Sequence, residues 1–215
     1  MRLLKAGIKA TKGAEGMAKL ADVVAKAGGD VMLVVPAIEE SYCALENMVE
    51  ALSKNEQEQA EQYWFAVLDE HVYWMQDLGL KPNEDVRIPM MPEYDTECSY
   101  EQNYHQIVSL AAILSSQIVA VYLLKSGVDT EWWNTSRFIL TESENEKLRL
   151  DLAYSEQIIR AGWHRDGRKS VVVLAGGIGG TKDGKQTCFG SAGADLTAEL
   201  MKNFLGAESI EGIIL

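Results

Sequence analysis

Two patterns of hydrophobic residues alternate along this chain. Short runs that are apolar at nearly every position, such as the five residues at 31–35, are typical of strands buried on both faces of a sheet. Longer stretches in which apolar residues recur every three or four positions are typical of helices with one buried side. The first pattern predicts strands at 2–5, 31–35, 130–133, 171–174 and 210–215. The second predicts helices at 14–26, 40–53, 56–78, 104–125, 147–161 and 194–204.

The order of these segments indicates the fold class. Parallel strands need a crossover connection, which is usually a helix, so strands that alternate with helices predict an α/β fold. We expect a three-layer αβα sandwich with a mainly parallel central sheet, formed as one domain by residues 1–215. Residues 85–103 lack a periodic pattern and contain Pro89 and Pro92, which leaves a lid or a mobile loop as the two interpretations.

The overall composition argues against several classes of function. A net charge of −12 and a pI near 4.7 disfavour nucleic acids and anionic membrane surfaces as partners. The apolar stretch at 107–124 is interrupted by serines and a glutamine, which favours a buried core helix over a membrane span. The histidines have no partner at ligand spacing, so we expect no metal site. The three cysteines, Cys43, Cys98 and Cys188, are widely spaced and odd in number, so we expect them to be unpaired in a cytoplasmic protein.

The most informative segment lies between residues 175 and 195. A glycine cluster follows the predicted strand at 171–174, and the next helix carries Asp195 in its first turn. Glycines at a strand end let the backbone approach an anion, and a helix N-terminus carries partial positive charge. We therefore expect an anion site, or a site at which the backbone approaches a ligand, at Gly176, Gly177, Gly179 and Gly180, because five residues with a single sizeable side chain are hard to explain by packing.

With Lys5 at the end of the first strand and Asp195 after the glycine turn, the chain resembles the amino-acid kinase family, and within it the aspartokinases. The similarity is strongest at 1–24, 109–122, 132–142 and 175–206. The resemblance implies that Lys5 and Asp195 are catalytic, although a lysine at a strand end is common. An acid in the first turn of a helix is also favoured by the helix dipole alone, by about 0.3–1 kcal/mol.

The resemblance also implies roles for other residues. Gly7 and Lys9, in the loop after the first strand, would face the terminal phosphates of a nucleotide together with the glycine cluster. Ser115, Thr141 and Glu142 would lie on the substrate side. For Ser115 on a buried helix, a simple bond back to the carbonyl four residues earlier is the plainer interpretation.

The chain departs from the family in the loops that contact phosphate. The family's first loop reads Lys-Phe-Gly-Gly-Thr-Ser, of which Lys5 and Gly7 remain. Its second loop carries two glycines where this chain has Glu39 and Glu40, and carboxylates there repel polyanionic substrates.

The substrate-binding positions differ as well. The central helix of the family carries a glutamate that binds aspartate, and this chain has Ala112 there. The arginine of the family's glycine turn is replaced by Ser191. The family continues through a Thr-Asp-x-Asp-Gly segment of its nucleotide pocket, which would begin where this sequence stops at Leu215.

Two hypotheses follow. The favoured one is a divergent, non-catalytic aspartokinase-related protein that binds a small anion or a protein partner and needs no cofactor. The alternative is an active aspartate kinase that uses ATP and Mg²⁺ to phosphorylate the side-chain carboxylate of aspartate. In either case the apolar segment 210–215 predicts a homodimer or a partner subunit that covers this edge.

Overall fold

The computed structural model describes residues 1–11, 13–144 and 147–214, with the side chains of residues 8, 9, 143, 144 and 147 left undescribed. Its core is a five-stranded sheet with the order β3-β6-β2-β1-β9, and each adjacent pair of strands is parallel. The strands are β1 (Arg2–Ala6), β2 (Val31–Val35), β3 (Thr130–Trp133), β6 (Val171–Ala175) and β9 (Ile210–Ile213). The predicted parallel sheet is therefore confirmed.

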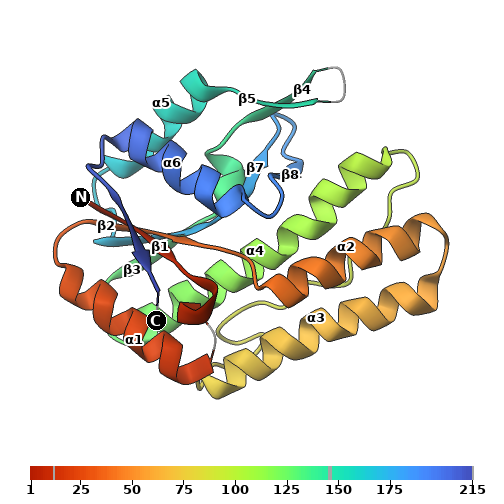
Figure 1. Ribbon diagram of the computed structural model, residues 1–215, viewed down its shortest axis with the longest axis horizontal. Coiled ribbons are helices and arrows are strands. Elements are labelled where there is room, and N and C mark those ends of the chain that lie inside the picture. The colour runs from red at the N-terminus through yellow and green to blue at the C-terminus, as the bar shows by residue number, and fades with distance from the viewer. Residues whose placement is uncertain (12, 145–146, 215) are drawn as a thin grey trace.

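Helices cover both faces of this sheet (Figure 1). On one face lie α1 (Gly13–Ala27), α4 (Tyr100–Lys125) and the C-terminal end of α3 (Gln57–Asp77). On the other face lie α5 (Leu152–Trp163) and α6 (Gly193–Leu205). This arrangement confirms the predicted three-layer αβα sandwich.

Alternation along the strands explains the two layers. Successive side chains of a strand point to opposite faces. Leu3 therefore packs with α5 and α6, whereas its neighbour Leu4 packs with α1 and α4. Every residue of β2 and of β6 is buried, as expected for central strands covered on both faces.

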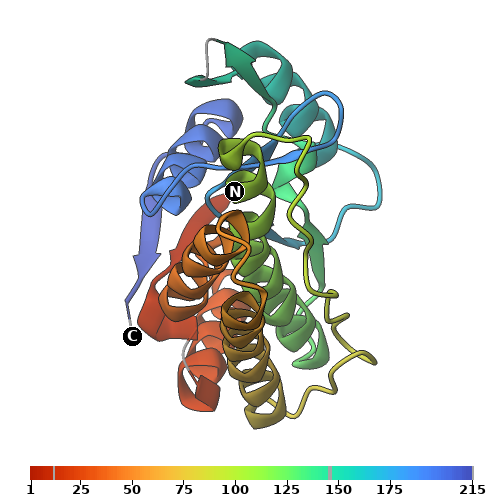
Figure 2. The ribbon, with the colours of Figure 1, turned by 90° about the vertical axis from the view of Figure 1, so that its right-hand side faces the viewer.

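A third hydrophobic cluster lies beyond the sheet. Helix α2 (Glu39–Ser53) and α3 form an antiparallel pair that packs against the N-terminal half of α4 (Figure 2). Trp64 of α3 and Met48 of α2 are buried there, together with Leu114 of α4.

Helix α4 is the one described helix that is long and apolar enough to cross a membrane by length and composition. Within its apolar window, however, 67% of the residues are buried inside the protein. Its C-terminal half packs under the sheet and its N-terminal half packs against α2 and α3. It is therefore the buried core helix that the sequence predicted.

The start of α4 corrects the predicted boundary of the loop at 85–103. The Ser99 hydroxyl accepts from the Gln102 backbone N–H at 3.2 Å, and the Gln102 side chain accepts from the Ser99 N–H at 2.9 Å. This capping box starts the helix at Tyr100, four residues earlier than the periodicity suggested. The remaining loop is tied to α4, because Asn103 bonds the backbone N–H and C=O of Asp95.

Two β-hairpins are absent from the predicted elements. Strands β4 (Thr141–Glu144) and β5 (Lys147–Leu150) pair antiparallel, so the prediction of helix at 147–150 is wrong. The helix begins after Asp151, whose carboxylate caps it by accepting from the Tyr154 N–H at 3.0 Å. Strands β7 (Ile178–Gly180) and β8 (Gln186–Cys188) form the second hairpin, inside the glycine-rich segment.

The last strand is shorter than predicted. Strand β9 ends at Ile213, and Leu215 lies outside the described residues. Two short 3₁₀ helices, η1 (Ile8–Thr11) and η2 (Thr135–Arg137), complete the described elements.

Candidate functional site

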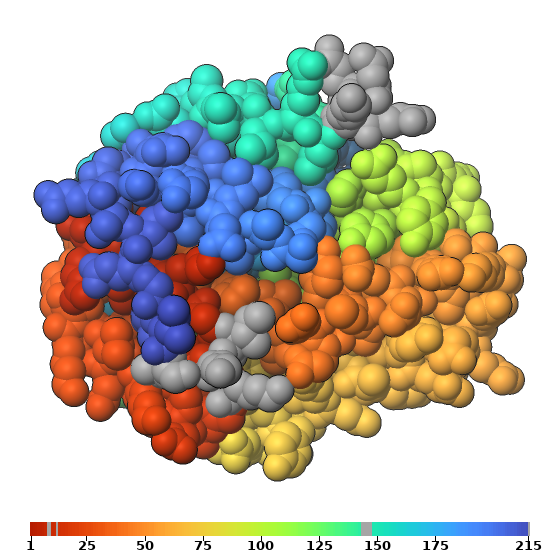
Figure 3. All heavy atoms as spheres, in the orientation of Figure 1, coloured from red at the N-terminus to blue at the C-terminus, as the bar shows by residue number. Residues whose placement is uncertain are grey.

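Lys5 and Asp195 meet at the carboxyl edge of the sheet. Lys5 lies near the end of β1 and Asp195 in the first turn of α6, and the Lys5 Nζ forms an ion pair with Asp195 Oδ1. The side chain of Lys5 is 27% exposed and that of Asp195 is 67% exposed. On the face shown in Figure 3, the first segment of the chain (red) adjoins the last helix and strand (blue). The pair is accessible to solvent, and each charge already has a counter-charge.

The glycine turn holds α6 against the sheet by close backbone contact. A Cβ added to Gly193 would lie 2.6 Å from the Gly177 Cα, and one added to Gly176 would lie 2.9 Å from the Ala194 Cβ. The buried Thr197 hydroxyl donates to the Gly193 carbonyl at 3.0 Å and accepts from the Gly177 N–H at 2.9 Å. The hydroxyl therefore fastens the first turn of α6 to the end of β6.

The hairpin glycines are also required by packing. A Cβ on Gly179 would meet Phe189 at 2.7 Å and the Ile139 carbonyl oxygen at 2.9 Å, and one on Gly180 would overlap the Ser136 carbonyl. The close contacts give these glycines a packing role, which was hard to justify from the sequence alone, and the anion site stays a prediction.

Backbone amides that were expected to face phosphate already bond to protein acceptors. The N–H of Gly7 donates to the Ile213 carbonyl at 2.9 Å, and that of Gly176 donates to the Val35 carbonyl at 2.8 Å. The N–H of Gly180 donates to Ile139, and that of Gly177 to Thr197. An anion at this turn would have to displace protein hydrogen bonds, or use donors other than these four amides. The side chain of Lys9 lies outside the described residues.

A cavity of about 190 Å³ opens beside the glycine turn. Its walls bring together Glu39 from the start of α2, Ala112 from the middle of α4 and Ser191 from the loop before α6. These are three of the positions at which the sequence departs from the family motifs. The other described lining residues include Pro36, Ala37, Tyr42, Val108, Gly176, Gly177, Ile178, Cys188, Gly190 and Ala194, and none of them is a lysine or an arginine.

A chain of polar groups extends from the wall of this cavity. The Tyr42 hydroxyl lies 3.1 Å from the Tyr104 hydroxyl and 3.6 Å from the Cys188 Sγ, and the Tyr104 hydroxyl donates to Glu46 at 2.5 Å. Burial raises the pKa of Tyr42, and burial together with Glu46 raises the pKa of Tyr104 to about 12. Burial also raises the pKa of the Cys188 thiol. The three groups are therefore protonated at neutral pH and offer hydrogen bonds rather than a nucleophile.

Of the predicted substrate-side residues, Ser115 lies apart from Thr141 and Glu142. Ser115 is buried on α4, donates to the Ala111 carbonyl at 2.8 Å and accepts from the Ile38 N–H at 3.2 Å, so it anchors the loop before α2. Thr141 and Glu142 instead line a separate, larger cavity of about 730 Å³. Glu142 is paired there with Lys182 at 2.5 Å.

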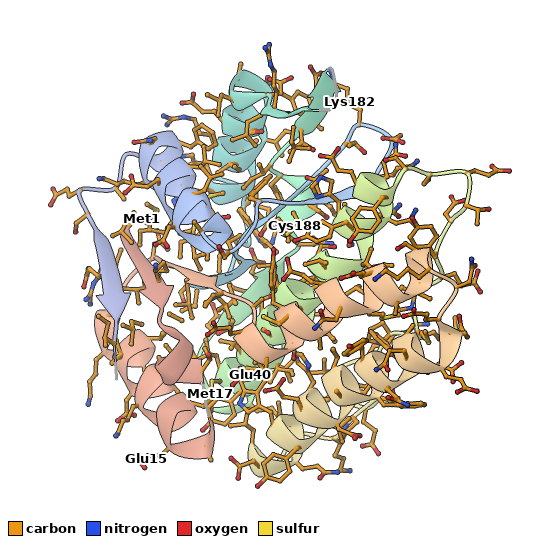
Figure 4. All side chains as sticks on the ribbon, turned by 45° about the vertical axis from the view of Figure 1, so that its right-hand side comes forward. Met1, Glu15, Met17, Glu40, Lys182 and Cys188 are labelled. Carbon is orange, nitrogen blue, oxygen red and sulfur yellow. The ribbon has the colours of Figure 1, made fainter. Side chains whose placement is uncertain are left out.

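In Figure 4, Cys188 lies in the interior of the molecule and Lys182 at its periphery. Lys182 lies beside the larger cavity and Cys188 beside the smaller one. Among the described residues, no group of three histidine, cysteine or acidic side chains is placed to hold a metal ion.

Sequence reasoning did not identify Thr197 or Tyr42. A threonine four residues after a glycine at a helix start is compatible with the bond from Thr197 to Gly193, but its second bond, to Gly177, depends on tertiary structure. The hydroxyl pair of Tyr42 and Tyr104 joins residues 62 apart in the chain, and no local pattern reveals it.

No protein-family model and no curated protein matches this sequence. Solved structures do match its fold. Aspartokinase III of E. coli, in complex with lysine and aspartate, aligns with a TM-score of 0.74 and 16% identity over 98% of this chain. The aspartate kinase of Clostridium acetobutylicum aligns with a TM-score of 0.64 and 14% identity over 99% of this chain.

The chain has the fold of the aspartokinases. The resemblance inferred from the sequence is thus confirmed for the architecture. The chain spans about half the length of these solved relatives: it covers 48% of the E. coli chain and 47% of the Clostridium chain.

Proposed function

We propose that this chain is a non-catalytic protein with the aspartokinase fold, which does not transfer phosphate to aspartate and acts by binding a partner. The observation that carries the proposal is the 190 Å³ cavity, in which Glu39, Ala112 and Ser191 meet. Each of the three stands where the similar family has a residue suited to phosphate or to an acidic substrate.

Charge explains why these replacements act together. A dicarboxylate such as aspartate needs cationic or N–H donors, and the arginine that would supply a fork of donors is replaced by the neutral Ser191. Glu39 adds a negative charge at the cavity, and a like charge 4 Å away costs about 1 kcal/mol in water and more where solvent is excluded. Phosphoryl transfer depends almost wholly on positioning and charge stabilisation, so these losses remove the means of catalysis.

One observation favours the alternative, an active aspartate kinase. Lys5 and Asp195, which the resemblance marks as catalytic, are both present and in contact. In that function Lys5 would leave Asp195 to neutralise the transferred phosphate, ATP would supply the phosphate and Mg²⁺ would neutralise the developing charge.

A turnover assay separates the two functions. The purified chain is incubated with Mg-ATP, L-aspartate and hydroxylamine, which traps any acyl phosphate as a coloured hydroxamate. We expect no more product from the wild-type chain than from the Lys5→Met and Asp195→Asn variants. Product that forms with the wild-type chain and disappears in both variants would establish the kinase and overturn the proposal.

The sheet edge supports a role in binding another chain. Among the described residues, β9 pairs with β1 alone, and Ile214 immediately after it is 86% exposed. Unpaired strand edges next to apolar side chains are usually covered in folded proteins. We expect a homodimer by light scattering at tens of micromolar and a monomer for Ile214→Lys. A wild-type chain that is monomeric under these conditions would contradict this part of the proposal.

A further inference from the structure

A cysteine and a lysine touch beside the larger cavity, outside the site described above. The Lys185 Nζ lies 3.6 Å from the Cys98 Sγ, and the Cys98 thiol donates to Asp95 Oδ2 at 3.1 Å. Cys98 belongs to the loop before α4, and Lys185 to the turn between β7 and β8. Both side chains are partly exposed, so small solutes reach them.

The backbone on each side of this contact is fixed by hydrogen bonds. Asn103 of α4 bonds Asp95 at its N–H (2.8 Å) and its carbonyl (2.9 Å), and so holds the turn that carries Cys98. On the other side, the Lys185 carbonyl accepts from the Thr181 N–H at 2.8 Å, and the Lys185 N–H donates to the Thr181 hydroxyl at 3.1 Å. The approach of sulfur and nitrogen is therefore built into two anchored turns.

We propose that Cys98 and Lys185 form a peroxide-driven covalent cross-link. In the first step the Cys98 sulfur attacks hydrogen peroxide, an S–O bond forms, the O–O bond breaks, and a sulfenic acid and one water result. In the second step the Lys185 amine attacks that sulfur, an S–N bond forms, the S–O bond breaks and a second water leaves. The sulfur loses two electrons in total, and one peroxide is reduced to two waters.

The neighbouring charges set the speed of the first step. The hydrogen bond to Asp95 raises the pKa of the Cys98 thiol, and Lys185 acts in the opposite direction. The thiolate is the reactive form, so Asp95 keeps the cysteine largely in its resting thiol state. Asp95→Asn removes the opposing charge and retains the Oδ1 that accepts from the Glu97 N–H, so this variant is expected to react several-fold faster.

The cross-link has a structural consequence. Ser99, next to Cys98, and Lys185 both line the 730 Å³ cavity. A bond between the two turns would join these two parts of the cavity wall covalently. Oxidation would thereby couple the loop before α4 to the β7–β8 hairpin, which are held together by non-covalent contacts in the reduced protein.

Mass spectrometry of the full chain after hydrogen peroxide treatment tests the proposal. We expect a product about 2 Da lighter than the reduced protein, and a proteolytic fragment that joins the peptides of Cys98 and Lys185. A thiol reductant restores the starting mass, and the exposed Cys43 serves as an internal reference for ordinary oxidation.

Three variants make the test specific. Cys98→Ser and Lys185→Arg both remove the joined fragment, whereas Asp95→Asn forms it faster. If Cys98 gains only oxygen atoms while Lys185 remains open to trypsin, the proposal is wrong. A joined fragment that persists in Lys185→Arg would overturn it equally.

Discussion

Removal of one hydroxyl tests how the glycine turn is fastened. Thr197→Val keeps the size and shape of the side chain but deletes the group that bonds both Gly177 and Gly193. Thr197 and Gly177 are both buried, so the Gly177 N–H would lose its protein partner. A buried, unsatisfied N–H costs about 1–3 kcal/mol, whereas the Gly193 carbonyl retains its place in the helix ladder.

We therefore expect Thr197→Val to lower the free energy of unfolding by about 2 kcal/mol. In a domain of this size that corresponds to a fall of about 4–8 °C in Tm. Urea unfolding is the appropriate assay. If the m-value is unchanged, a lower urea midpoint reports a loss of stability alone. Thr197→Ser is the matched control, because it keeps the hydroxyl and loses one buried methyl group, worth about 0.8 kcal/mol. A Val variant within about 0.5 kcal/mol of wild type, or less destabilised than the Ser variant, would refute this account of the turn.

Three further predictions concern packing, pH and the ion pair. Gly193→Ala should cost about 3 kcal/mol, because its Cβ would lie 2.6 Å from neighbouring backbone, whereas Gly212→Ala meets nothing within 4 Å and should leave the urea midpoint nearly unchanged. Equal midpoints for these two variants would argue against the close approach. Burial lowers the pKa of His71 in the folded protein. An unfolded histidine has a pKa of about 6.5, so at a pH below this value the unfolded state binds a proton that the folded state does not. As the pH falls from 6.5 to 5, the free energy of unfolding should therefore decrease by up to about 1.4 kcal/mol per pH unit, and this decrease should be smaller in His71→Gln. Urea midpoints measured across this pH range test both expectations, and equal slopes for the two proteins would disprove the role of His71. Asp195→Asn should change stability by less than about 1 kcal/mol, since its ion pair with Lys5 is open to solvent; a loss of 3 kcal/mol in the same assay would mean that the pair has a structural role.

The fold could be predicted where side-chain patterns are strong. Strand β2 has exactly the predicted bounds because its five residues are apolar and flanked by Gly29-Asp30 and Pro36. The hairpin β7–β8 could not be predicted, because Gly179 and Gly180 have no side chains to form a periodic pattern. These two form a strand by pairing with Thr187 and Gln186 of β8, and Ile139 and Ser136, which are far away in the sequence, leave no room for side chains on them.

Boundaries depended on caps that the periodicity does not reveal. The Ser99 and Gln102 pair starts α4, and Asp151 starts α5, in both cases through side-chain bonds to backbone N–H groups. The alternating Lys-Leu-Arg-Leu at 147–150 is a strand pattern, and the helix predicted at 147–161 included it wrongly. Local capping chemistry therefore decided where these helices begin.

The candidate site was predicted in parts. The resemblance to the aspartokinases indicated Lys5 and Asp195 as a pair, and the structure places them in contact. That Glu39, Ala112 and Ser191 line one cavity could not be read from the sequence, because they come from three separate elements. The sequence already indicated what each replacement removes, and the fold adds that the three positions line the same cavity.

Titration of L-aspartate into the purified chain by isothermal calorimetry shows whether the cavity beside the glycine turn binds an acidic substrate. Because the cavity combines Glu39 with the neutral Ser191, the account predicts no saturable heat at millimolar aspartate for the wild-type chain. It predicts measurable binding for the double variant Glu39→Gly/Ser191→Arg, and none for Ser53→Arg, which adds an arginine at an exposed position on α2, away from the cavity. Saturable binding of aspartate by the wild-type chain, as tight as that of the double variant, would contradict the account.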